Sequence, residues 1–186
     1  MKKTAIVVIA LLAVSGAAWA QSAGSQNPVI DTTKSIMARY AKNIIAAAEQ
    51  MPADAYSFKP TPQQQSFGHI VEHIAGSNYF LCSTIAGTPQ PQTEKVTEND
   101  SKEKLVKAMK DSFEYCGQAI DKANDSQLGQ EVTLFGGRKA PKAAAVIALD
   151  MDFADHYAGM AQYLRLKGML PPSAQQQQPA KPADKK

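Results

Sequence analysis

The chain has 186 residues, of which 44% are hydrophobic and 20% are charged, and its formal net charge is +3. This length predicts a single domain, and this hydrophobic content excludes a chain that is disordered throughout. Removing Lys2 and Lys3 with a leader lowers the charge from +3 to +1, and removing the three Lys and one Asp of residues 171–186 lowers it to −1. The part expected to fold therefore has no basic surface of the kind that binds nucleic acid.

Residues 1–20 have the pattern of a secretory signal peptide. Two lysines precede an apolar run at residues 5–14, and Ala18-Trp19-Ala20 matches a cleavage site. The apolar run is shorter than the roughly 20 residues of a membrane-spanning helix, so the expected mature protein begins at Gln21 and has no membrane span. These features predict a periplasmic or secreted protein, with an uncleaved N-terminal anchor as the alternative.

The two ends of the mature chain are predicted to lie outside the domain. Residues 21–30 are expected to form a flexible N-terminus, and residues 31–170 the domain itself. Residues 171–186 are rich in Gln, Pro and Lys, which is typical of a disordered tail. The alternative for this tail is a basic tether to an anionic envelope surface.

Four segments between these ends have the apolar spacing of amphipathic helices. They are residues 31–50, 66–86, 100–123 and 141–167. Ser66 is the expected N-cap of the second helix and Gly87 its C-terminal stop, while Asp100 and Glu103 suggest a capping box for the third. Residues 132–137 allow one small hairpin. The pattern predicts an all-α four-helix bundle with long connections after its first and second helices.

The three histidines lie on the predicted helices at informative spacings. His69 and His73 are four residues apart on the second helix, and Asp152 and His156 are four residues apart on the fourth. Facing helices that each offer such a pair are how bundles build internal metal sites, and these residue types suit a divalent ion such as Zn, Ni, Fe or Mn. The alternative is that His73 and His156 are hydrogen-bonded core residues.

Two of these segments also resemble a known family. Residues 66–75 (SFGHIVEHIA) look like the second helix of the DinB-like (DinB/YfiT) metalloenzymes, and residues 152–159 (DFADHYAG) with residues 163–168 (YLRLKG) resemble the last helix. The resemblance covers about residues 30–172. It implies an up-down-down-up bundle with a divalent ion held by one His of the second helix and a His-x-x-x-His pair of the fourth.

Carried over by position, the resemblance assigns His73 as the first ligand and His156 as the last. The middle ligand falls on Asp152, where the family's pattern usually has His. An Asp can bind a metal, so the site either survives with a different charge or is degenerate. His69 is a weaker candidate, which would supply a third imidazole if the ion lay nearer the start of the second helix.

The implied topology also makes a prediction about the two cysteines. Cys82 lies 16 residues after Ser66, and Cys116 lies 16 residues after Asp100. In parallel helices that start at one level, both would be about 24 Å along the helix axis. An oxidising compartment then favours a Cys82–Cys116 disulfide, with two buried free thiols as the alternative.

These observations favour a metal-dependent enzyme of hydrolase or transferase type that acts on a small-molecule substrate, with no catalytic residue assigned. Asp155 and Glu72 are candidates for a base, or else solvated helix charges. Cytosolic relatives include transferases that use bacillithiol or mycothiol, and the predicted export argues against that chemistry. The alternatives are a non-catalytic metal-binding bundle and a degenerate interaction protein of the cell envelope. The sequence leaves open whether the chain forms a homodimer, and whether its aromatic residues line a pocket, an interface or the core.

Overall fold

The computed structural model describes residues 25–177. The predicted signal peptide at residues 1–20 and the end of the predicted tail, residues 178–186, lie outside the described residues. Four long helices dominate: α1 (Pro28–Gln50), α2 (Phe67–Ala86), α3 (Lys102–Ile120) and α4 (Lys142–Leu166). The shorter elements are η1 (Ala53–Ala55), η2 (Asp125–Gln127), β1 (Glu131–Thr133), η3 (Phe135–Gly137), β2 (Lys139–Pro141) and α5 (Pro172–Gln175).

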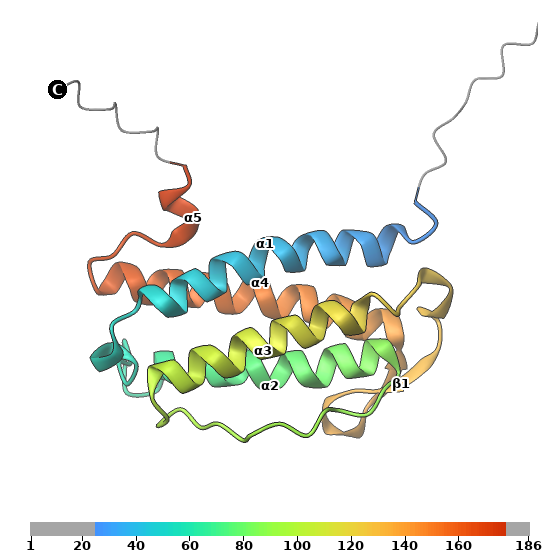
Figure 1. Ribbon diagram of the computed structural model, residues 1–186, viewed down its shortest axis with the longest axis horizontal. Helices are drawn as coiled ribbons and strands as arrows, with labels where there is room; N and C mark the ends of the chain where they lie inside the picture. Colours follow the sequence, from blue (N-terminus) through green and yellow to red (C-terminus); the bar gives the residue numbers. More distant parts are fainter. Residues whose placement is uncertain (1–24, 178–186) are drawn as a thin grey trace, which may run out of the picture.

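The long helices pack lengthwise around one core (Figure 1). Each helix contributes an apolar stripe, as its spacing predicted. Fully buried examples are Ile44 of α1, Ile74 of α2, Met109 of α3, and Leu149 and Phe153 of α4. None of the helices in residues 25–177 is long and apolar enough to cross a membrane.

The mostly helical fold agrees with the prediction, and a small sheet is added to it. Strands β1 and β2 pair antiparallel, with Val132 opposite Ala140. The turn between them contains Gly136 and Gly137, both with positive φ of 68° and 76°. Since glycine adopts this backbone conformation without steric cost, the Gly-Gly pair permits the tight turn of the hairpin that was predicted at residues 132–137.

Helices α2 and α3 run in the same direction in Figure 1, and residues 87–101 return alongside them from the end of α2 to the start of α3. Cys82 of α2 and Cys116 of α3 form a disulfide, with their Cα atoms 5.2 Å apart. The two cysteines therefore lie at the same level of the two helices, as the sequence reasoning expected for parallel helices.

The structure agrees with the predicted start and end of α2 and corrects the predicted start of α3. The Ser66 side chain accepts a hydrogen bond from the His69 N–H, and Gly87 ends the helix with a φ of 70°. The N-cap of α3 is Ser101, whose side chain accepts from the Lys104 N–H. The predicted capping box of Asp100 is wrong, because the Asp100 carboxylate instead accepts from the Thr97 N–H and the Lys104 ammonium.

The ends of the domain also extend beyond the prediction. Helix α1 begins at Pro28 rather than Asp31, so the last part of the segment expected to be flexible is helical, and Ile30 is buried. At the other end, α5 contradicts a disordered tail from residue 171. Pro172 is buried there, and the Ser173 N–H donates to the Tyr157 hydroxyl over 2.8 Å.

Candidate metal centre

Helix α2 places His73 on the side that faces α4. Its neighbours Ile70 and Ile74 are buried in the core, while His73 keeps a side-chain exposure of 39%. The Ser77 hydroxyl, one turn further along α2, lies 3.1 Å from Nε2 of His73. The sequence analysis did not predict this contact, although the four-residue spacing places His73 and Ser77 on the same face of the helix.

Helix α4 supplies Asp152 and His156 from consecutive turns. The fully buried Phe153 anchors this part of α4 in the core, and the two polar side chains are each 16% exposed. Nδ1 of His156 lies 2.8 Å from the backbone carbonyl oxygen of Asp152. An N–H at Nδ1 donates to that carbonyl, which leaves the lone pair of the neutral ring on Nε2.

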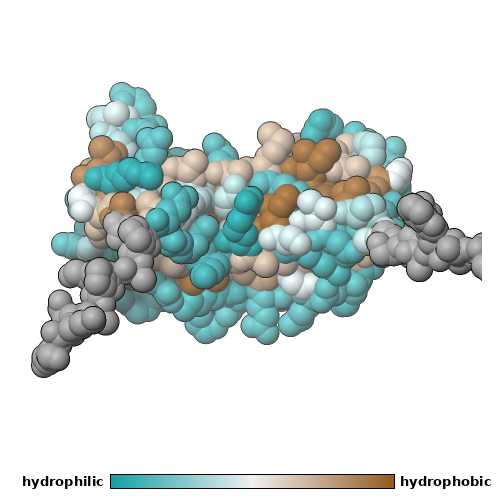
Figure 2. Space-filling view, turned by 90° about the horizontal axis from the view of Figure 1, so that it is seen from above, coloured by the Kyte–Doolittle hydropathy of each residue, from teal (hydrophilic) through white to brown (hydrophobic). Residues whose placement is uncertain are grey.

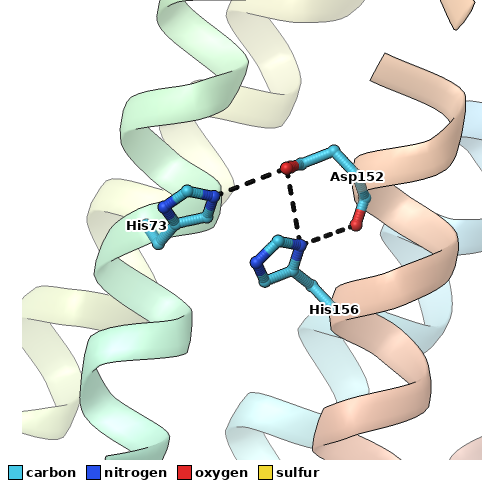
Figure 3. A group of neighbouring side chains, drawn as sticks. All are labelled: His73, Asp152 and His156. Atoms are coloured by element: carbon cyan, nitrogen blue, oxygen red, sulfur yellow. Dashed lines mark hydrogen bonds and ion pairs between the residues drawn. The ribbon is translucent and has the colours of Figure 1, made fainter. Parts of the chain in front are cut away.

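The three side chains converge between the two helices (Figure 3). His73, Asp152 and His156 each offer a ligand atom, and these atoms all lie within 4.8 Å of one another. The two imidazole rings stack with centroids 4.5 Å apart and an interplanar angle of 20°. The structure thus brings together the three residues that the family resemblance had assigned by position.

One carboxylate of the group connects both rings. Oδ1 of Asp152 lies 3.4 Å from Nε2 of His73 and 3.5 Å from Nδ1 of His156. These separations are long for charged hydrogen bonds. Two ligand atoms that each bind a tetrahedral divalent ion over about 2.1 Å are about 3.4 Å apart, which matches the distance from Asp152 to His73.

The electrostatics of the group also fit a cation. A hydrogen bond to Asp152 raises the pKa of His73 above its ordinary value of 6.5, against the opposing effect of burial. The second carboxylate oxygen, Oδ2 of Asp152, is buried and has no hydrogen-bond partner among the described residues. A buried carboxylate oxygen without a partner is costly, and a bound divalent cation would relieve that cost.

His69 is not brought into the group. Its ring centroid lies 6.5 Å from that of His73, and its Nδ1 lies 3.6 Å from the Glu72 carboxylate. The structure thus places this weaker candidate ligand on the α2 surface, one turn before His73.

A cavity of about 360 Å³ lies beside His156, at the end of the site near the start of α2. The side chains of Gln64, Gln65 and Gln162 line it together with Asp155. The Tyr163 hydroxyl donates to the backbone oxygen of Gln65 over 2.6 Å and holds that loop against α4. One of the two candidate bases, Asp155, therefore lies where a molecule next to His156 would contact it.

The other candidate base and the remaining aromatic candidates lie elsewhere. Glu72 lines a separate cavity together with Tyr79 on the outer face of α2 and α3. Tyr157 is buried in the core, and the Tyr115 hydroxyl lies 2.8 Å from that of Ser83. The Phe80 ring packs against that of Phe135 of η3, with ring centroids 4.3 Å apart and an interplanar angle of 34°.

Comparison with solved structures identifies the same fold in proteins of low sequence identity. A DinB-like protein from Bacillus cereus aligns with a TM-score of 0.64 at 16% identity, over 79% of this chain and 97% of its own. A DinB-like protein from Bacillus subtilis aligns with a TM-score of 0.62 at 24% identity, over 75% and 95% of the two chains.

A third structure is that of a mycothiol-dependent maleylpyruvate isomerase mutant, with a TM-score of 0.57 and 11% identity. The alignment covers 69% of this chain and 59% of the isomerase. At such identities these likenesses concern the fold alone. No protein of curated function matches the chain in sequence.

The family model described as the DinB superfamily matches residues 38–150, which is more than half of the chain. The matched region includes His69 and His73 and ends before Asp152. Sequence and fold therefore agree, and the chain belongs to the DinB superfamily.

Proposed function

We propose that this protein binds one divalent metal ion through His73, Asp152 and His156, and that it is a metal-dependent enzyme of hydrolase or transferase type. The observation that carries the proposal is the group of three ligand atoms within 4.8 Å, one of them on a carboxylate whose other oxygen is buried without a partner among the described residues. Two imidazoles and one carboxylate leave room for a further ligand, which is typical of catalytic rather than structural sites.

Each side chain has a definite role in this proposal. Asp152 neutralises part of the ion's charge and orients both rings, while the carbonyl that accepts from Nδ1 of His156 fixes the orientation of that ring. The ion, when bound, supplies Lewis acidity. Gln64, Gln65 and Gln162 hold polar groups of a substrate in the adjoining cavity, and Asp155 can accept a proton there.

The test is the metal content of the mature chain, residues 21–186, exported to a periplasm without a His tag. Elemental analysis is expected to find about one divalent ion per chain, and to find none in His73→Ala, Asp152→Ala or His156→Ala. His69→Ala is the matched control, because it removes an imidazole of the same helix that lies outside the group, and it should keep the ion. Thermal unfolding of each variant shows whether it has folded.

Two results would contradict the proposed metal site. Absence of metal from the purified protein, with no rise in melting temperature on adding Zn, Ni or Mn, would favour a metal-free interaction protein of the envelope. If Asp152→Ala keeps the ion and His69→Ala loses it, the metal site lies nearer the start of α2 than proposed.

A cobalt-substituted sample distinguishes an enzyme from a purely structural metal-binding protein. An open position on the ion should bind azide and change the visible spectrum of the cobalt protein. An unchanged spectrum at saturating azide would mean that the coordination shell is closed, and the non-catalytic alternative would then be preferred.

Export and topology are further parts of the proposal. We infer cleavage after Ala20 and a periplasmic or secreted location, which N-terminal sequencing of the exported protein would test by finding Gln21 first. We also infer the up-down-down-up four-helix bundle of the family. The parallel course of α2 and α3, linked by the Cys82–Cys116 disulfide, supports this topology.

A further inference from the structure

A second cavity lies on the other side of α2, between α2, α3 and residues 88–97, which have no regular secondary structure. It measures about 440 Å³, which is within the size range of small-molecule sites. None of the three candidate metal ligands lines it. In Figure 1 the connecting segment runs along these two helices for their whole length.

The cavity exists because side chains on its floor are small and the segment stands away from them. Ala75 and Gly76 of α2 lie at the level of Ala108 of α3, and all three line the cavity. A Cβ built on Gly76 would meet no atom within 4 Å, whereas one built on Gly68 would lie 2.8 Å from the Glu98 backbone oxygen. The connection between α2 and α3 therefore contacts α2 closely at Gly68, through Glu98, and is separated from α2 at Gly76.

The walls combine an aromatic ring with apolar surface. Tyr79 lines the cavity one turn after Gly76, and Val96 lines it from the connecting segment. Burial, reinforced by the nearby Asp111 carboxylate, raises the pKa of the Tyr79 hydroxyl. A flat apolar molecule can pack against this ring and against the small floor residues.

The rim carries charges of both signs in equal number. Lys95, Lys104 and Lys107 line the cavity together with Glu72, Glu94 and Asp111. Lys107 pairs with Asp111 over 2.6 Å, and Lys104 pairs with Glu94 over 3.0 Å. Exposed ion pairs of this kind contribute little to stability. A ligand that carries both an ammonium and a carboxylate can therefore replace a lysine in one pair and a carboxylate in the other with little loss of free energy.

We propose that this cavity binds a free aromatic amino acid, with its ring over Gly76 and beside Tyr79 and its two charges among the rim pairs. The equal number of lining charges favours a zwitterion over an anion or a cation of the same size. The apolar floor and the tyrosine ring favour an aromatic side chain over a small one. This site is independent of the candidate metal centre.

The experiment is a two-dimensional NMR titration of the mature chain with L-phenylalanine. Three comparison compounds each lack one group of L-phenylalanine. Phenylacetate lacks the ammonium, phenethylamine lacks the carboxylate, and L-alanine lacks the ring. Saturable shifts are expected for amides of α2, α3 and residues 88–97 with L-phenylalanine. Each comparison compound should bind at least tenfold more weakly.

Gly76→Leu fills the cavity and should weaken phenylalanine binding at least tenfold. Gly117→Leu is the matched control, because Gly117 is also a helical glycine at which a Cβ would meet no atom within 4 Å, and it does not line the cavity. It should leave binding unchanged. Ala108→Leu fills the same space from α3 and replaces Gly76→Leu if that variant does not fold.

Three outcomes would overturn the proposal. These are the absence of saturable shifts at millimolar phenylalanine, equal binding of phenylacetate or phenethylamine, and unchanged binding in both cavity-filling variants. Metal content is measured on the same samples, so failure at this cavity is distinguishable from failure at the metal centre.

Discussion

Asp152 has one carboxylate oxygen near two imidazoles and a second oxygen that is buried without a partner among the described residues. In the metal-free protein the first oxygen favours the protonated form of His73, and this accounts for the raised pKa of that ring. The same carboxylate is expected to bind the ion when metal is present. Protons and metal therefore compete for one group of atoms.

The first prediction concerns the pKa of His73 in metal-free protein. Asp152→Asn should lower it, because the amide keeps the shape and removes the charge that favours the imidazolium. The raised pKa in the folded protein stabilises the fold below about pH 6.5, and this contribution is lost as the pH rises through the folded-state value. The stability difference between the two proteins should therefore shrink at alkaline pH.

NMR titration of the His73 ring measures this pKa directly. Asp155→Asn is the control, since its exposed carboxylate makes no ion pair with His73 in the structure. An unchanged His73 pKa in Asp152→Asn would contradict the proposed contact.

The second prediction concerns metal affinity as a function of pH. Metal binding requires neutral imidazoles, so the affinity for Zn²⁺ should fall as the pH decreases through the pKa of His73. Competition with a chromophoric chelator between pH 5 and 8 measures this dependence. An affinity that does not change over that range would argue against histidine ligands.

At the scale of single elements, the N-terminus of α1 depends on Asp125 of η2, a residue that is distant in the sequence and adjacent in the fold. The Asp125 carboxylate accepts hydrogen bonds from the Val29 and Ile30 N–H groups over 2.9 and 3.0 Å. The Asn27 side chain in turn accepts from the Asp125 N–H over 3.0 Å. A carboxylate at a helix N-terminus satisfies free N–H groups and interacts favourably with the helix dipole.

The third prediction follows from this cap. Asp125→Ala should reduce the free energy of unfolding by about 1 kcal/mol, as for other lost caps. Asp121→Ala is the comparison, because its exposed ion pair with Lys34 should contribute only a few tenths of a kcal/mol. Urea denaturation of both variants measures the difference, and equal stabilities would contradict a capping role.

The cap also explains why the start of α1 was predicted three residues too late. Asn27 makes no side-chain cap of its own, and the capping carboxylate comes from η2, almost a hundred residues along the chain. In contrast, Ser66 caps α2 within three residues, and its role was predicted correctly. Local caps are visible in a sequence, whereas caps supplied by another element are not.

At the scale of the whole molecule, the Cys82–Cys116 disulfide joins the parallel helices α2 and α3 and closes a loop that contains the connection between them. It links α2 and α3 across 34 residues, including the segment that crosses the length of both helices. Parallel neighbours need such a crossing, and its ordering lowers the entropy of the chain. A covalent link limits the conformations of the unfolded chain and so offsets part of that loss.

The fourth prediction is that removing this link costs stability without changing the fold. The double variant Cys82→Ala, Cys116→Ala should be less stable by about 3 to 4 kcal/mol, the value expected for a closed loop of this length. Thermal unfolding of the variant, beside the wild type with and without reductant, measures the loss. Reductant should have no effect on the variant, and equal stability of variant and oxidised wild type would contradict the prediction.

The sequence by itself determined the four long helices, the Ser66 cap, and the four-residue spacings of His69 with His73 and of Asp152 with His156. These features follow from periodicities within one helix turn or a few turns, so neighbouring residues are enough to reveal them. The tertiary structure decided the rest. It excluded His69 from the cluster, ordered α5 against Tyr157, and opened a cavity at Gly76, because each depends on contacts between residues far apart in the chain.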